Sequence, residues 1–179
     1  MPNHIHNKLQ IVGSKEEVEA VMNYIRSEEL GNNTIDFNKI TKMPDWVYGS
    51  SKEVRGISLD DEVKYLGNTS LDWSRENWGT KWNAYAQPNN RNTSNTIYFN
   101  TAWNAPLVLI SKIAVIFPNV EVHHWYADED IGYHCGYFAY KDTDILHEEP
   151  FESKSDKAIA LGIDLVHNGN YNRSKGEYE

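Results

Sequence analysis

Hydrophobic and polar residues largely alternate near the start of the chain and then change to a helical spacing. The alternation over 5–12 predicts a strand. From Val18 to Ile25 the apolar residues recur every three or four positions, which predicts an amphipathic helix. The preceding Ser14-Lys15-Glu16-Glu17 has the form of a capping box. We therefore expect a strand followed by a capped helix.

The order of strand, helix and strand occurs twice along the chain. The further elements that the pattern predicts are a short strand over 34–40, a strand over 96–100, a helix over 107–117, and strands over 120–126 and 134–141. Two split βαβ units of this kind form an antiparallel sheet with two helices on one face. The sequence thus predicts an α+β protein with a ferredoxin-like core.

Two stretches lie outside this repeated order. Residues 45–95 are rich in aromatics without a sustained period, and we interpret them as an insertion with short helices within 54–66 and 71–85. Residues 144–179 are acidic, and their last part has the composition of a disordered tail. We therefore expect one ferredoxin-like domain over 1–143 and a C-terminal extension over 144–179.

The composition indicates where in the cell the protein is located. The chain has 179 residues, of which 40% are hydrophobic, and no apolar run approaches the roughly 20 residues needed to span a bilayer. Its first residues have neither a basic nor an apolar signal region, and Cys135 is its single cysteine. We expect a cytoplasmic protein without membrane contact.

The negative charge is concentrated in one part of the chain. Of the formal net charge of -9, most arises between Glu121 and Lys157, where ten acids stand against three lysines. This charge disfavours general binding of nucleic acid, which needs an excess of Lys and Arg. The acids we select as a candidate binding surface for a basic partner are Asp144, Glu148, Glu149 and Glu152. A solvated face is the simpler interpretation of the same residues.

A dense aromatic block, residues 77–85, is the second candidate. Trp78, Lys81, Trp82 and Tyr85 could stack unpaired bases or an aromatic ligand, with the lysine contacting a phosphate. The same indoles could equally form part of the hydrophobic core, and we favour this structural interpretation for most of them.

No set of residues forms recognisable catalytic machinery. His4 and His6 lie on one side of the first strand, but no spacing matches a zinc motif. The acids Asp128-Glu129-Asp130 resemble only a fragment of a cation loop, and a solvated turn explains them more simply. Pro2 could act as a terminal amine catalyst but has no matched partner. We expect no catalytic residue, no metal and no cofactor.

Several blocks of uncommon residues occur in the order found in a known family. They are Met1-Pro2-Asn3-His4 with Asn7-Lys8-Leu9, Ile35 to Ile40 with Met43-Pro44, Glu76 to Tyr85, Phe99 to Trp103 with Ala105-Pro106-Leu107, Phe117-Pro118, and Trp125 to Glu129. In these blocks the chain resembles the YubB ferredoxin-like family. The family is carried by phages, prophages and plasmids and has no settled activity, so the resemblance implies a fold but no site residues.

The family context and the charge together lead to one main functional expectation. We expect an accessory protein of a phage or mobile element that binds a host protein in the bacterial cytoplasm, for example as an inhibitor of an antiviral defence system such as CRISPR or restriction. The alternative is a nucleic-acid-binding protein that uses the block from Trp78 to Tyr85. A small metal-dependent enzyme is a weaker third alternative.

Overall fold

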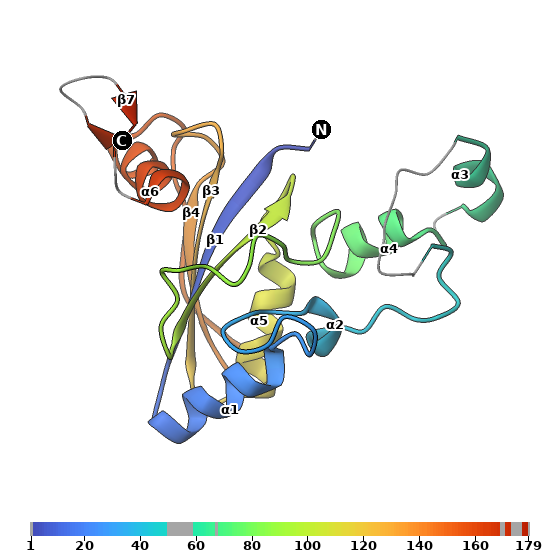
Figure 1. Cartoon of the computed structure of the whole chain (residues 1–179), viewed down its shortest axis with the longest axis horizontal. Coiled ribbons are helices and arrows are strands. Elements are labelled where there is room, and N and C mark those ends of the chain that lie inside the picture. Colours follow the sequence, from blue (N-terminus) through green and yellow to red (C-terminus); the bar gives the residue numbers. More distant parts are fainter. Residues whose placement is uncertain (1, 50–58, 67, 169–170, 173–176, 179) are drawn as a thin grey trace.

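A five-stranded antiparallel sheet forms the centre of the molecule (Figure 1). The computed structural model describes residues 2–49, 59–66, 68–168, 171–172 and 177–178. The strands lie in the order β2-β1-β3-β4-β5, and each pairs antiparallel with its neighbour. Their bounds are β1 His4–Val12, β2 Thr96–Ala102, β3 Glu121–Asp128, β4 Gly136–Lys141 and β5 Asp144–Pro150. The α+β class and the antiparallel sheet that the sequence predicts are confirmed.

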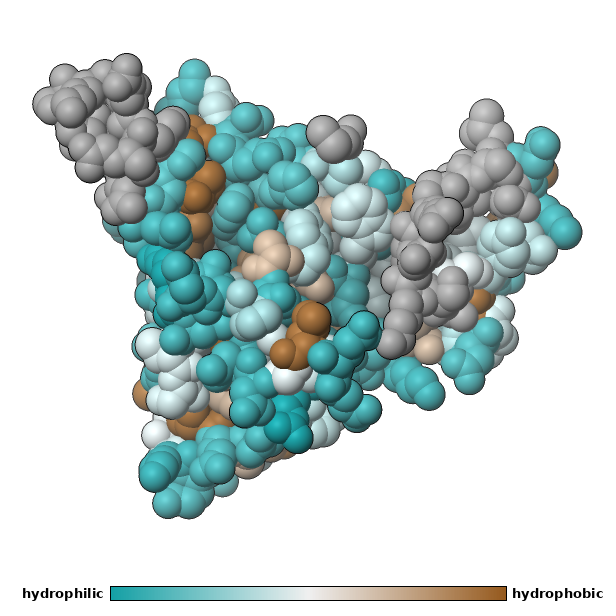
Figure 2. Space-filling view, in the orientation of Figure 1, coloured by the Kyte–Doolittle hydropathy of each residue, from teal (hydrophilic) through white to brown (hydrophobic). Residues whose placement is uncertain are grey.

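The helices lie on both faces of this sheet and beyond its β2 edge (Figure 1). Their bounds are α1 Lys15–Ile25, α2 Phe37–Ile40, α3 Leu59–Tyr65, α4 Ser70–Asn77, α5 Leu107–Ile116 and α6 Asp156–His167. Two short strands near the C-terminus, β6 Tyr171–Asn172 and β7 Glu177–Tyr178, pair with each other. The face seen in Figure 2 is mainly hydrophilic, with hydrophobic side chains in small separate areas.

The alternating burial of β1 divides the structure into two layers. Ile5, Leu9 and Ile11 are fully buried on the face that α1 and α5 cover. Burial of each such side chain contributes about 1.5–3 kcal/mol to folding. The even-numbered residues of β1 from His4 to Gln10 are only partly buried and point to the other face. The two helices that the sequence predicts on one face are therefore α1 and α5.

The predicted capping box begins α1. The backbone N–H of Glu17 donates to Ser14 Oγ at 3.3 Å, and the Ser14 backbone N–H donates to Glu17 Oε2 at 3.0 Å. Together the two bonds satisfy donors that a helix start leaves free. In α5, Ile113 is fully buried, whereas Val108 and Val115 are more than half exposed. The near-uniform apolar sequence of α5 is thus buried on one side only.

A third helix, α6, packs on the opposite face of the sheet (Figure 1). Its Ala158 and Leu165 are buried against Ala127 of β3 and Cys135. Gly162 permits the close approach, since a Cβ there would lie 3.3 Å from the backbone nitrogen of Gly132. The segment after residue 143 therefore supplies an edge strand and a helix to the described structure, while most of its last twelve residues lie outside the description.

The predicted strand over 34–40 is wrong. Residues Phe37–Ile40 form the short helix α2, whose start is capped because the Asp36 carboxylate accepts from the Asn38 N–H at 3.0 Å. Asn83 holds the same turn, since its Nδ2 donates to Asp36 at 2.7 Å. The described residues therefore form one split βαβ unit instead of two: β2, α5 and β3, with β1 between the two strands.

The helices predicted in the insertion are shorter than expected. The helix over 71–85 ends at Asn77, because Gly79 takes the left-handed φ of 78° and the Thr80 hydroxyl donates to the Ala102 carbonyl at 2.8 Å. Of the helix predicted within 54–66, the first residues lie outside the description and the rest is α3.

A polar cluster is buried between β1, β2 and β3. His124 is fully buried, and its Nε2 lies 3.0 Å from Asn7 Oδ1. Asn7 Nδ2 donates to Thr101 Oγ1 at 3.0 Å, so Asn7 Oδ1 is the acceptor and the histidine is the donor. The other ring nitrogen of His124 has no partner in the described part of the chain. Burial lowers the pKa of His124 to about 3, which keeps the ring neutral.

This neutral histidine predicts sensitivity to acid. The pKa of His124 is lower in the folded state, so the unfolded chain binds more protons between pH 6.5 and 3, and stability falls as the pH falls through this range. We expect the free energy of unfolding to drop by about 2 kcal/mol from pH 7.5 to pH 5 on account of this residue. Urea unfolding of wild type and His124→Gln at both pH values measures the difference; an equal loss in the two proteins would contradict it.

Candidate functional site

The aromatic block divides into a buried part and an accessible part. Trp78 is 3% exposed, and its Nε1 donates to the Thr41 carbonyl at 2.8 Å. Its ring makes edge-to-face contacts with Phe37 at 5.8 Å and Trp73 at 5.4 Å between centroids. Such a buried and hydrogen-bonded indole belongs to the core. Trp78 therefore has no free face for a ligand.

Tyr85 is also a structural residue. Its backbone exchanges two hydrogen bonds with Asn100 of β2, at 3.0 and 2.8 Å. Its hydroxyl donates to the Thr101 carbonyl at 3.1 Å and lies 2.5 Å from His4 Nδ1. Burial raises the pKa of Tyr85 to about 12, so the phenol stays protonated. The residue ties the segment after α4 to the sheet edge.

Lys81 and Trp82 remain partly exposed and form a cluster with Arg75 and Trp103, two residues outside the predicted set of site residues. The Lys81 ammonium lies 4.7 Å from the Trp82 ring centroid and 4.5 Å from that of Trp103. The Arg75 guanidinium lies 4.7 Å from the same Trp103 ring. We call these four residues the cationic cluster. The sequence could not reveal it, because Trp103 follows β2 and is far from the block along the chain.

The face of the sheet on which α6 packs carries a stack of aromatic rings that contact one another. Trp125 and Tyr137 stack at 4.7 Å between centroids, and His147 lies 4.8 Å from Tyr137. The Lys8 ammonium occupies a position 4.6 Å from the Trp125 centroid. Sheets that bind RNA offer free aromatic faces to bases. Here the rings contact one another instead, so the stack is explained by stability.

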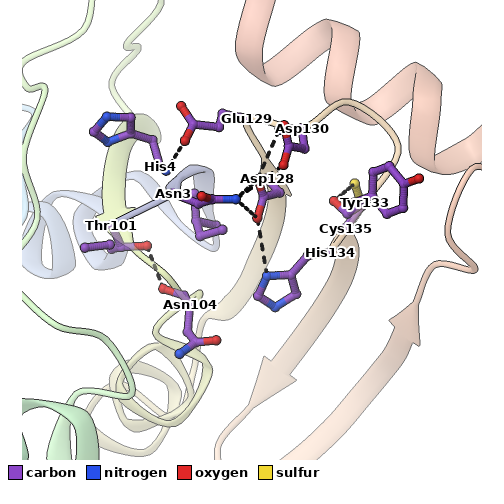
Figure 3. Close-up of polar contacts among 12 residues, drawn as sticks. Asn3, His4, Thr101, Asn104, Asp128, Glu129, Asp130, Tyr133, His134 and Cys135 are labelled. Atoms are coloured by element: carbon purple, nitrogen blue, oxygen red, sulfur yellow. Dashed lines mark hydrogen bonds and ion pairs between the residues drawn. The ribbon is translucent and has the colours of Figure 1, made fainter. Parts of the chain in front are cut away.

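The acids of the β3–β4 turn are engaged with the N-terminal residues (Figure 3). Asp128 Oδ1 accepts from Asn3 Nδ2 at 3.2 Å and from the Asp130 N–H at 3.0 Å. Glu129 accepts from the His4 N–H at 3.1 Å, and His134 lies 3.9 Å from Asp128. These bonds fit a turn that anchors the N-terminus. Among the described residues, no group of three His, Cys, Asp or Glu could hold a metal ion.

The single cysteine lies beside this turn and is protected. Cys135 is 2% exposed, and its thiol donates to the Tyr133 carbonyl at 2.9 Å (Figure 3). Burial raises the pKa of Cys135 to about 11. Because the thiolate is the reactive form, this thiol is a poor nucleophile near neutral pH.

Three of the four selected acids lie on β5, the outermost strand. Asp144 and Glu148 are exposed and form no ion pair within the described residues, and neither does Glu152 after the strand. Glu149 differs, because it accepts from Lys157 at 2.6 Å and lies 3.1 Å from His147. The hydrogen bond from Lys157 lowers the pKa of Glu149. The predicted acidic surface is thus an edge of the sheet.

The two edges of the sheet differ in how they are covered. Along β2, the chain from Lys81 to Asn92 bonds to the outer backbone, with the Lys81 N–H 3.4 Å from the Ala102 carbonyl and Asn92 Oδ1 2.8 Å from the Tyr98 nitrogen. Along β5, no strand of the described chain pairs with the outer side. Ile145 is 59% and Leu146 49% exposed there. Within the described residues, the sheet therefore has one open edge.

The comparisons with known proteins agree with this architecture. Residues 81–164 match the family model described as the ferredoxin-like domain in Api92-like protein, which confirms the predicted ferredoxin-like fold. The matched range includes β5 and most of α6. No curated protein matches the chain.

One solved structure is also similar. It is the crystal structure of the protein api92 from Yersinia pseudotuberculosis, with 11% sequence identity, a TM-score of 0.44, and coverage of 87% of this chain and 100% of that one. The finer expectations, membership of the YubB family and an origin in phages or plasmids, have no counterpart in these matches and stay predictions. No described helix is long and apolar enough to cross a membrane.

The different positions of Trp78 and Trp82 predict different effects on stability. Trp78→Ala removes a buried ring and should lower the free energy of unfolding by about 3–5 kcal/mol. Trp82→Phe removes an indole N–H that is buried without an acceptor in the described part of the chain, and should leave stability unchanged or raise it by about 1 kcal/mol. Chemical denaturation measures both; a loss above about 2 kcal/mol for Trp82→Phe would contradict this assignment.

Proposed function

We propose that this protein is a binding protein that recognises a basic, extended segment of a partner protein at the outer edge of β5. The observation that carries the proposal is the open edge itself, since the strand exposes backbone groups that a further strand can pair with. Many domains bind peptides in this way, with backbone hydrogen bonds giving affinity and alternate side chains giving specificity.

The charge of the edge indicates which strand it admits. Asp144 and Glu148 have no cationic partner in the described chain, so a bound strand with lysine or arginine at matching positions would neutralise them. A second copy of β5 would instead place like charges opposite one another, which is unfavourable. The acids thus disfavour pairing between copies and favour a basic partner.

The exposed hydrophobic residues add contact area beside these charges. The β4–β5 pairing advances from Ala139–His147 to Tyr140–Ile145, so Leu146 is an extra residue on β5. Such a bulge increases the local twist and re-aims side chains. Ile145 and Leu146 are both about half exposed or more and would lie against an added strand. A partner segment that carries both basic and apolar residues fits this edge best.

A narrower form of the proposal concerns the identity of the partner. The resemblance to a family carried by phages and plasmids supports a partner from the bacterial host, and a host antiviral defence system is the specific case that we propose. An acidic edge suits such a partner, because proteins that act on nucleic acid present basic surfaces.

Charge reversal on β5 tests this function. The probe is a fluorescently labelled (Lys-Val)4 peptide, and anisotropy measures its affinity for the purified protein at about 50 and 200 mM salt, a range over which charge screening increases. We expect wild type to bind, with weaker binding at higher salt, and Asp144→Lys/Glu148→Lys to bind at least tenfold more weakly because attraction is replaced by repulsion.

The matched control reverses two acids of α1. Glu16 and Glu19 are exposed residues of α1 rather than of β5, and Glu16→Lys/Glu19→Lys changes the net charge by the same amount. This control should keep most of the affinity. Equal loss in both double variants would mean that only net charge matters, and a wild type that does not bind the peptide would contradict the proposal.

A further inference from the structure

The cationic cluster gathers positive charge in a protein of opposite net charge. Arg75 and Lys81 both lie against the ring of Trp103, at 4.7 and 4.5 Å from its centroid. The two charged groups are therefore no more than about 9 Å apart, which is close to the screening length at physiological salt. Folding thus holds two like charges near each other.

No acid of the described chain neutralises these charges. Neither Arg75 nor Lys81 forms an ion pair with a described residue, whereas Arg91 pairs with Asp164, and Lys157 with Glu149. Aromatic rings attract cations through their negative faces but leave the charge in place. Both charges are therefore without an ion-pair partner in the described chain, and a bound anion would offset them.

The backbone at Trp103, whose ring contacts both cations, is strained. Its φ is 71°, a left-handed value that is an outlier for so bulky a residue. The strain is held by a hydrogen bond from the Trp103 N–H to the Asn3 carbonyl at 3.0 Å. Outliers of this kind gather at ligand-binding sites, where the surrounding structure maintains them. This observation is independent of the charges and points to the same place.

We propose that the cationic cluster is a binding site for the phosphate group of a nucleotide, either free or within a single nucleic-acid strand. Arg75 provides a planar donor fork that suits phosphate oxygens, and Lys81 a second charge. The partly exposed rings of Trp82 and Trp103 border the two cations and supply aromatic contact area for the base. The site lies near β2 and is separate from the proposed protein-binding edge at β5.

Fluorescence anisotropy measures the affinity for a single nucleic-acid strand, with a labelled 12-nucleotide oligothymidylate as the probe. Calorimetry measures the affinities for adenosine monophosphate and for inorganic phosphate. Arg75→Gln/Lys81→Gln should bind the ligand that wild type prefers at least tenfold more weakly. For the oligonucleotide, the slope of log affinity against log salt should flatten by about 1.4, because two contacts with single-strand phosphates are lost.

Two further variants separate the site from net charge and from folding. Lys15→Gln/Lys154→Gln removes two exposed lysines, one at the start of α1 and one before α6, and should keep the wild-type affinity. Arg75→Lys/Lys81→Arg keeps both charges and should retain most of the binding even if the glutamine variant is unstable. Absence of binding to all three probes, or equal loss in both glutamine variants, would overturn the proposal. Binding to the oligonucleotide alone would assign the site to a strand, and binding to the monophosphate would assign it to a free nucleotide.

Discussion

The register of β1 between β2 and β3 is the constraint on which the rest of the structure depends. Because side chains alternate along a strand, a slip by one residue would move Leu9 from the core to the α6 face and bring Lys8 into the core. The buried hydrogen bond between Asn7 and His124 joins β1 to β3 inside the α1–α5 layer and is satisfied only in this register. Both layers of the molecule therefore rely on one strand.

The strand order gives the sheet two unlike edges. At the β2 edge, the segment after α4 covers the backbone and carries Lys81 to Trp103, so positive charge collects there. At the β5 edge the backbone is open within the described chain, and Asp144 and Glu148 lie without cationic partners. The net charge of -9 does not reveal that positive and negative charges lie at different edges of the sheet. An acidic protein can in this way present a basic site without contradiction.

Local patterns predicted most of the sheet but little of the candidate sites. In β1, α1, β2, α5, β3 and β4, the spacing of the apolar residues reflects burial of one face. The elements that this spacing predicts are the ones that form. At 34–40 the same alternation buries Ile35 and Phe37, yet the Asp36 cap and the distant Asn83 make a helical turn. The acids of β5 carry no apolar alternation, and the cationic cluster joins residues far apart in the chain. Such contacts are decided by tertiary structure.

Hydrogen exchange of the backbone amides in β5 tests the central claim most directly. The exchange of residues 144–150 would be measured by mass spectrometry with and without saturating (Lys-Val)4 peptide. If a basic strand pairs with the open edge, these amides should exchange more slowly in the complex, while the already covered amides of β2 should not change. Unchanged exchange at 144–150 under saturation, or protection only at a distant surface such as α1, would contradict strand addition at β5.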